Sequence, residues 1–232
     1  RSKKEFEKNI IESLEWLGLR VNEGPEIGGS AGPYRQSERI KQGIYQKYVE
    51  ILLEQDLAYY CFLTAEELET HKQAAKNSGK PYIHDRSRSL VSESEKKQFL
   101  ANEKPYVIRF KMTKNETILV KDLIRKDIEF DCNLQSDFVI MKSDGMPSFN
   151  FAVVVDDALM NITHVLRGED HISNMPKQLA LYQALGLTPP DFAHLPMILG
   201  PDKSKLSKRH GATAVTDYYQ QGFLKEAILN YL

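Results

Sequence analysis

Apolar residues recur at intervals of three or four near both ends of the chain, and this spacing predicts amphipathic helices there. The first helix ends at Gly18, and its apolar face comprises Phe6, Ile10, Leu14 and Leu17. Residues 223–232 keep the same pattern up to the last position, with no glycine, proline or polar cap to end the helix. We therefore expect the chain to be a piece of a longer parent protein.

Four more helices are predicted between these ends. Apolar spacing over residues 40–52 indicates one long helix. Thr64 and Glu67 form a capping box that opens a polar helix, and a charged helix covers residues 93–100. The last of the four ends at Gly186, since glycine commonly follows the final helical residue.

The residue pattern in the middle of the chain predicts strands. Residues 57–63 fit either a buried strand or a linker, and short alternating runs between residues 80 and 141 indicate an antiparallel β-rich module. Residues 151–157, "FAVVVDD", contain five unbroken apolar positions, which predict a strand covered on both faces, and residues 162–166 predict another strand. This order of elements predicts an α/β nucleotide-type fold interrupted by an insertion.

Composition narrows the class of protein. The 232 residues are 41% hydrophobic and 27% charged, which is typical of a globular chain and excludes a disordered or fibrous one. No apolar run is long enough for a membrane span or resembles a secretory signal, so we expect a cytoplasmic location, or an organellar matrix. The net charge of -1 means that any anion site must come from a local patch.

One such patch is the loop of residues 200–214, "GPDKSKLSKRHGATA". It holds Lys203, Lys205, Lys208 and Arg209, with the Ser207 hydroxyl between cations. Lysine can follow phosphate oxygens as they move, so the loop is suited to a polyphosphate. A solvated basic loop is the equal alternative.

A second polar cluster follows the predicted strand of residues 162–166. It contains Arg167, Glu169, Asp170 and His171, at the kind of strand end where open α/β sheets bind ligands. Arg167 suits a carboxylate, whereas a simple surface ion pair with Glu169 or Asp170 is the alternative.

The other candidates for a chemical site are weaker. Asp156 and Asp157 fit either a metal site or a turn at a strand end. His194 is interpreted as a packed core histidine. No glycine-rich phosphate motif occurs, and the two cysteines lie in no zinc-ligand spacing.

Four motifs together resemble the glutamyl-tRNA synthetases, a family of class I aminoacyl-tRNA synthetases, in their bacterial or organellar form. They are "GPYRQSER" (32–39), "VVVDD" (153–157), "VLRGEDH" (165–171) and "KLSKR" (205–209), and their order and spacing match along essentially the whole chain. The resemblance implies a Rossmann-type α/β core without its N-terminal part, split by an α+β connective-peptide domain and followed by the start of a helical stem-contact region. The implied divisions are 1–60 and 138–200 for the core, 61–137 for the insert that binds the acceptor stem, and 201–232 for the KLSKR loop and stem-contact start.

The implied activity is ATP-dependent ligation of glutamate to tRNA(Glu) through glutamyl-adenylate. Lys205, Ser207 and Lys208 would be catalytic, because positive charge there stabilises the leaving pyrophosphate. The ATP-binding residues would be Lys205, Lys208, Arg209, Asp170 and, through its backbone, Ile198. ATP would enter as its Mg²⁺ complex, and no zinc is expected because "YYCFL" around Cys61 lacks a second cysteine.

The resemblance also implies a glutamate site and a tRNA surface. Arg167 would hold the side-chain carboxylate, which is the basis for choosing glutamate over glutamine. The other glutamate-binding residues would be Phe149, Asn150, Val153 and His171. The candidate tRNA phosphate contacts are Arg35, Arg39, Arg86, Arg88 and Lys111, for which solvated surface side chains are the equal alternative. The expected partners are tRNA(Glu), L-glutamate and ATP, for a protein that is a monomer and binds no membrane.

The HIGH motif of class I synthetases is absent from the sequence, and in the resemblance it would precede Arg1. The chain alone is therefore expected to be inactive in adenylate formation. Two other functions stay open at this point: a non-catalytic fragment that binds the tRNA acceptor, and an enzyme that glutamylates a modified tRNA base.

Overall fold

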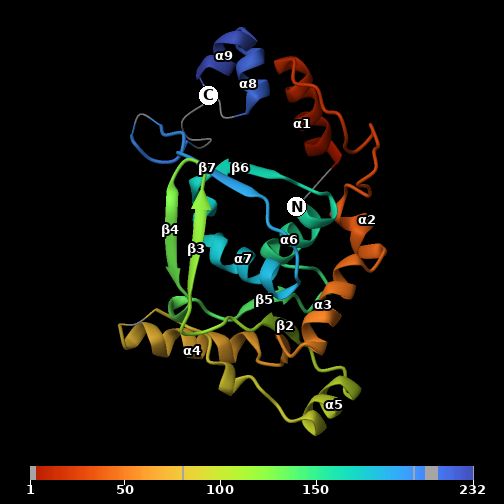
Figure 1. Ribbon diagram of the computed structural model, residues 1–232, viewed down its shortest axis with the longest axis vertical. Helices are drawn as coiled ribbons and strands as arrows, with labels where there is room; N and C mark the ends of the chain where they lie inside the picture. The colour runs from red at the N-terminus through yellow and green to blue at the C-terminus, as the bar shows by residue number, and fades with distance from the viewer. Residues whose placement is uncertain (1–3, 80, 201, 207–213, 232) are drawn as a thin grey trace. The chain divides into compact units, whose positions relative to one another are not determined.

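The computed structural model divides the chain into two compact units. It describes residues 4–79, 81–200, 202–206 and 214–231 (Figure 1). The larger unit comprises Pro33–Arg167 and His171–His194, and the smaller comprises Arg1–Gly32, Gly168–Asp170 and Leu195–Leu232.

The helices and strands alternate irregularly along the chain. The α-helices are α1 (Lys4–Leu17), α2 (Gln36–Lys41), α3 (Ile44–Glu54), α4 (Ala65–Asn77), α5 (Glu93–Ala101), α6 (Phe149–Leu159), α7 (Met175–Ala184), α8 (Val215–Gln220) and α9 (Lys225–Tyr231). The 3₁₀ helices are η1 (Arg86–Arg88), η2 (Cys132–Leu134) and η3 (Glu169–Asn174). The strands are β1 (Ala58–Cys61), β2 (Val107–Phe110), β3 (Thr117–Asp122), β4 (Lys126–Asp131), β5 (Phe138–Met141), β6 (His164–Gly168) and β7 (Asp191–Leu195).

Three short strands form an antiparallel sheet in the order β1-β2-β5. Ala58 lies opposite Phe110, and Ile108 lies opposite Met141 in the next pair. The apolar run near residue 60 is therefore a strand rather than a linker, and the predicted antiparallel pairing in this region is confirmed.

The second sheet has the order β4-β3-β7-β6 and contains the parallel pairing expected of an α/β fold. β3 and β4 form a hairpin whose register runs from Thr117 opposite Asp131 to Asp122 opposite Lys126. β3 runs parallel to β7, with Asp122 paired to Phe192. The hairpin, which the sequence places in the insert, thus belongs to the same sheet as β6 and β7. The domain boundaries at residues 60 and 137 stay a prediction.

Three helices supply much of the core of the larger unit. α6 contacts α3, α7 and β5, and α7 also contacts β3. Burying large apolar side chains on several elements at once is the main favourable contribution to folding. The fully buried members include Tyr45, Val49, Leu52, Phe151, Val154, Met175, Leu181 and Tyr182.

The prediction of a buried strand over residues 151–157 is wrong, because this segment lies in α6. In a strand, Phe149 and Phe151 would face the same side, whereas in a helix they point about 200° apart. Phe149 is 53% exposed and Phe151 is 0% exposed, as the helix requires. The helix has neighbours around most of its circumference, so its apolar run is nearly continuous and imitates the pattern of a two-sided strand.

The single long helix predicted over residues 40–52 is also wrong. Gly43 adopts a left-handed backbone conformation, with φ 68°, and separates α2 from α3. Glycine has no Cβ and adopts this conformation at little cost, so the chain changes direction here while the apolar spacing continues. Gly186, with φ 64°, follows α7 as predicted.

The smaller unit is built on α1. This helix contacts α8 and α9, and the Trp16 ring lies 5.5 Å from that of Tyr219, centroid to centroid. The helices predicted at the two ends of the chain are thus confirmed. No helix among the described residues combines the length and the apolar character needed to cross a membrane.

Candidate functional site

Three neutral groups hold the guanidinium of Arg167, near the end of β6. Its Nε–H donates to His194 Nε2 at 3.1 Å, and one Nη donates to Gln178 Oε1 at 2.9 Å and to the sulfur of Met175 at 3.0 Å. His194, Gln178 and Met175 are completely buried. These three partners are uncharged, and together they fix the direction of the guanidinium.

A chain of hydrogen bonds runs from Arg167 to Asn150. A guanidinium has only donors, so Gln178 must present its oxygen to Arg167 and its amide N–H to the next residue. That N–H donates to Asn150 Oδ1 at 3.0 Å. Two residues predicted to bind glutamate, Arg167 on β6 and Asn150 on α6, are thereby brought together through Gln178.

The remaining predicted glutamate-binding residues lie on the same two segments of chain. The ring of Phe149 lies 5.5 Å from the ring of His171, whose Nδ1 is 3.2 Å from the Asn174 amide nitrogen. Val153 lies one turn along α6 from Asn150 and is half-buried. The sequence placed Val153 on a strand over residues 151–157, but α6 includes all three of Phe149, Asn150 and Val153, in the same unit as His171 and Arg167.

The smaller unit carries the described part of the basic loop. Leu199 pairs with Lys205 in an antiparallel bridge, and Leu206 N–H donates to the Ile198 carbonyl at 2.9 Å. The Lys205 ammonium lies 2.6 Å from the Asp170 carboxylate. Three predicted ATP-binding residues, Lys205, Asp170 and Ile198, are thus close together in this unit. Ser207, Lys208 and Arg209 lie outside the described residues.

Arg39 is an internal residue, which corrects its prediction as a tRNA contact. Its side chain is 3% exposed, and its Nε lies 3.3 Å from Asp156. Tyr45 donates its hydroxyl proton to the same carboxylate at 2.9 Å. Asp156 therefore compensates a buried cation inside the core, and it lies within a helix rather than at the strand end that the sequence suggested.

Arg86 and Lys111 are also held by carboxylates. Arg86 donates from two nitrogens to Asp137, at 2.7 and 2.9 Å, and the Lys111 ammonium lies 2.5 Å from Asp56. Asp137 is buried and also accepts from the Tyr59 hydroxyl. The pair formed by Arg86 therefore stabilises the fold, and a phosphate contact would have to compete with Asp137.

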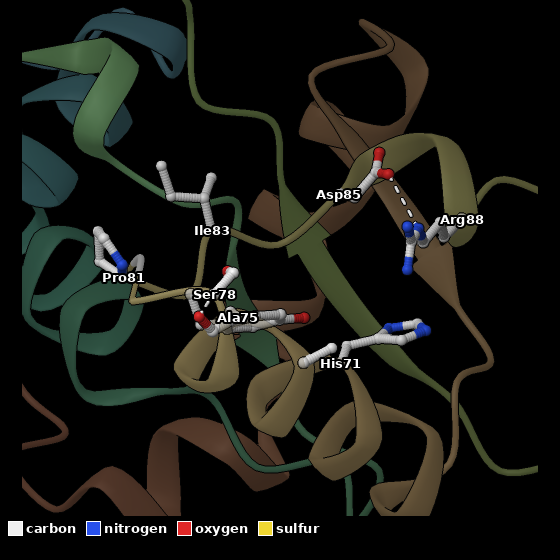
Figure 2. A pocket seen from close by; sticks show the side chains of 9 residues that line it. His71, Ala75, Ser78, Pro81, Ile83, Asp85 and Arg88 are labelled. Atoms are coloured by element: carbon white, nitrogen blue, oxygen red, sulfur yellow. Dashed lines mark hydrogen bonds and ion pairs between the residues drawn. The ribbon is translucent and has the colours of Figure 1, made fainter.

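Arg88 is the most exposed of the predicted tRNA contacts, and Arg35 is half-buried, as Arg86 is. Arg35 donates to Glu38 one helical turn along at 3.2 Å. Arg88 is 60% exposed in its side chain, donates to Asp85 at 3.1 Å and lines a cavity of about 410 Å³. Figure 2 shows this pair facing His71 and Ala75 on α4, with Ser78, Pro81 and Ile83 completing the wall.

Burial of Asp157 leads to a testable pH dependence. Burial raises the pKa of Asp157 to about 6. The negative charge of the neighbouring Asp156 adds to this effect, and the positive charge of Arg167 opposes it. The folded protein therefore binds this proton more tightly than the unfolded chain does. Protonated Asp157 therefore contributes fully to the free energy of unfolding below pH 4, and this contribution is lost as the pH rises through about 6.

Asp157→Asn is thus expected to raise the free energy of unfolding at pH 8 by about 1–3 kcal/mol and to change it little at pH 4. Urea denaturation at both pH values measures this difference. Asp127→Asn, at an exposed position on β4, is the control. An equal effect of Asp157→Asn at the two pH values would contradict the assignment.

Cys61 and Cys132 are buried thiols that form no disulfide with each other. Within the described ranges, no group of three or more His, Cys, Asp or Glu side chains is placed to hold a metal ion. Asp156 and Asp157, which the sequence suggested as either a metal site or a turn, therefore belong to no such group among the described residues.

Sequence reasoning missed Gln178 and Asp122 and underrated His194. His194 is a buried core residue as predicted, but it also binds Arg167 and lies 2.6 Å from Asp122. Asp122 lies 72 positions before His194. No local pattern connects such positions, so only the parallel pairing of β3 with β7 reveals the cluster.

Comparison with known proteins places the whole chain in one family. The family model described as class I tRNA synthetases (E and Q), catalytic domain, matches residues 1–232. The chain is 50% identical over 232 residues to glutamate–tRNA ligase 2 of Caldicellulosiruptor saccharolyticus and 52% identical over 233 residues to the glutamate–tRNA ligase of Sulfurihydrogenibium sp.. Each match covers 100% of this chain and 48% of the relative, so the chain spans about half the length of these relatives.

Solved structures agree with the sequence comparison. The crystal structure of a glutamate tRNA ligase from Elizabethkingia meningosepticum, in complex with its amino acid, superposes with a TM-score of 0.87 and 38% identity. It covers 97% of this chain and 49% of that one, and the enzyme from Elizabethkingia anophelis gives the same TM-score. The predicted Rossmann-type class I fold is confirmed, and the chain belongs to the catalytic domain family of the class I tRNA synthetases for glutamate and glutamine.

Proposed function

We propose that the protein containing this chain ligates glutamate to tRNA(Glu), using ATP as its Mg²⁺ complex. The observation that carries the proposal is the directed, charged guanidinium of Arg167 among His194, Gln178 and Met175. It occurs in a chain about half identical to glutamate–tRNA ligases. A fixed positive charge of this kind favours a carboxylate over the neutral amide of glutamine.

In the proposed first step, the α-carboxylate of glutamate attacks the α-phosphorus of ATP and pyrophosphate leaves. Arg167 holds the side-chain carboxylate, and Asn150, Phe149, Val153 and His171 form the surrounding surface. Asn150 accepts from Gln178 through its oxygen, so its amide N–H₂ is oriented as a donor group for the substrate. The glutamyl group then passes to the terminal ribose of tRNA.

Lys205, Lys208 and Arg209 bind the phosphates in this scheme, with Ser207 between them and the backbone near Ile198 against the adenine. The Lys205 ammonium, now on Asp170, would transfer to phosphate oxygens, which are competing anionic acceptors. As negative charge grows on the pyrophosphate, these cations stabilise the transition state more than the ground state. No covalent intermediate with the enzyme is required.

The tRNA surface in this proposal retains Arg35 and Arg88 and omits Arg39, which is buried. Arg86 and Lys111 are secondary candidates because the carboxylate that holds Arg86 is buried and only 15% of the Lys111 side chain is exposed. A monomer acting in the cytoplasm is the proposed working form. The other two functions suggested by the sequence are not favoured, since the relatives named above are glutamate–tRNA ligases.

Glutamate-dependent exchange of pyrophosphate into ATP, with tRNA present, tests the proposal in the full-length parent protein. Lys205→Ala is expected to lower the exchange rate about 100-fold, the usual cost of removing one group that stabilises transition-state charge. Lys47→Ala, which removes an exposed lysine from α3, is the matched control. Exchange that does not require glutamate, or that is unaffected by Lys205→Ala, would contradict the proposal.

A further inference from the structure

A buried pair of side chains lies next to the Nε of Arg167. Asp122 is at the end of β3 and His194 is on β7, and both side chains are 0% exposed. The His194 Nδ1 lies 2.6 Å from Asp122 Oδ2, and its Nε2 accepts from Arg167 at 3.1 Å. One imidazole therefore bridges a carboxylate and a guanidinium.

The hydrogen-bond donors fix the protonation state of this imidazole. Arg167 can only donate, so Nε2 of His194 must be the nitrogen without a proton. The proton is then on Nδ1 and is donated to Asp122. A doubly protonated ring would place an N–H against the guanidinium N–H, and the opposite tautomer would do the same.

Backbone N–H groups hold the Asp122 carboxylate in the position from which it accepts the His194 proton. Its Oδ1 accepts from the backbone N–H groups of Arg125 at 2.7 Å, Ile124 at 3.0 Å and His194 at 3.3 Å. Burial would raise the pKa of Asp122, but the backbone N–H of Arg125, the His194 side chain and the remaining donors lower it to about 2. The carboxylate therefore stays ionised and leaves Oδ2 for the imidazole.

We propose that Asp122 and His194 are positioning residues that hold the Arg167 guanidinium in the direction needed for the side-chain carboxylate of glutamate. Asp122 selects the tautomer of His194, His194 accepts from Nε of Arg167, and Gln178 accepts from Nη2 on the same edge of the guanidinium. This inference rests on the proposed function, and it extends it by making a residue of the β3–β4 hairpin part of substrate selection.

Two substitutions of His194 separate positioning from simple packing. Glutamine can place its amide oxygen near the position of Nε2 and keep the acceptor for Arg167. Asparagine places its amide near Nδ1, so it keeps a donor for Asp122 and loses the acceptor. In the full-length parent protein, His194→Asn is expected to raise KM for glutamate about tenfold and to leave KM for ATP unchanged. His194→Gln is expected to keep KM for glutamate close to that of the unmodified protein.

Asp122→Asn tests the other half of the pair. The asparagine amide can donate to Nδ1 and thereby drive the proton to Nε2, against Arg167, so KM for glutamate is expected to rise about tenfold here too. His164→Asn, at an exposed histidine on β6, is the matched control and should leave both KM values unchanged.

A measurement on the unmodified protein reads the protonation of His194 directly, and a variant is needed only to assign the signals. With ¹⁵N-labelled histidine, the His194 signals, identified by their loss in His194→Gln or by their change in Asp122→Asn, should show protonated Nδ1 and unprotonated Nε2. A proton on Nε2 would overturn the positioning role. Glutamate-dependent exchange by the unmodified protein tests the function separately: if exchange occurs and His194→Asn folds with an unchanged KM for glutamate, the inference fails while the function stands.

Discussion

Replacing Arg167 with alanine is expected to lower kcat/KM for glutamate about 10²–10³-fold in the pyrophosphate exchange reaction of the full-length parent protein. In the proposed mechanism, the substitution removes the charge that receives the substrate carboxylate and leaves that carboxylate without its ion-pair partner. Truncating one member of a desolvated, hydrogen-bonded charge pair costs roughly 3–4 kcal/mol, which corresponds to this factor. Steady-state exchange at varied glutamate concentration, at saturating ATP, measures the change.

Two further variants define what Arg167 supplies. Arg167→Lys keeps the charge but loses the planar fork that His194 and Gln178 direct, so its kcat/KM should lie between those of alanine and the unmodified protein. Arg20→Ala, at an exposed arginine after α1, is the control and should not change the rate. If Arg167→Ala were to retain full kcat/KM for glutamate, Arg167 would not be the carboxylate ligand.

Replacing Phe151 with alanine is expected to lower the free energy of unfolding by about 3–5 kcal/mol, the usual range for truncating a buried phenylalanine. Phe151 has no exposed surface and lies in the core that α6 forms with α3 and α7. The lost contacts leave a cavity that neighbouring helices fill only in part. Urea denaturation followed by circular dichroism measures the effect.

Phe149 provides a matched control two positions earlier on the same helix. Its side chain is 53% exposed, so Phe149→Ala should cost less than about 1 kcal/mol. The contrast also tests the secondary structure, because the two rings would share one face of a strand but lie on opposite faces of a helix. Equal losses of stability from the two substitutions would be inconsistent with α6.

Local signals in the sequence were reliable where one short segment contains all the interacting atoms. The capping box of Thr64 and Glu67 is confirmed at the start of α4: Glu67 N–H donates to the threonine hydroxyl at 3.2 Å, and Thr64 N–H donates to the glutamate carboxylate at 2.7 Å. The charged helix around residues 93–100 is likewise confirmed as α5. These interactions span three positions and need no tertiary context.

Apolar pattern was less reliable inside the core. The run "FAVVVDD" has the composition of a buried strand, yet it forms α6, since a helix with neighbours around most of its circumference loses the usual polar face. Gly43 changed the interpretation of residues 40–52 in a similar way. Its left-handed conformation breaks the helix although the apolar spacing continues across it.

The charged side chains show the same limit. The sequence predicts Arg167, Lys205 and Asp170 as site residues, and in the structure Arg167 donates to His194 while Lys205 pairs with Asp170. The sequence does not distinguish a buried arginine from a surface one, and so Arg39, held by Asp156 in the core, was grouped with the tRNA contacts. Burial depends on what packs over a residue, which single-sequence patterns do not contain.

The order of the motifs and their residue types were sufficient for the family, the α/β class and the positively charged groups suited to a carboxylate and to phosphates. Tertiary structure was required for the links between distant segments: Asp122 with His194, His194 with Arg167, and Arg167 through Gln178 with Asn150. The physical reason is the direction of hydrogen bonds. An arginine in the sequence establishes that a positive charge is present. The buried acceptors around it, contributed by β7 and α7, determine the direction of its guanidinium.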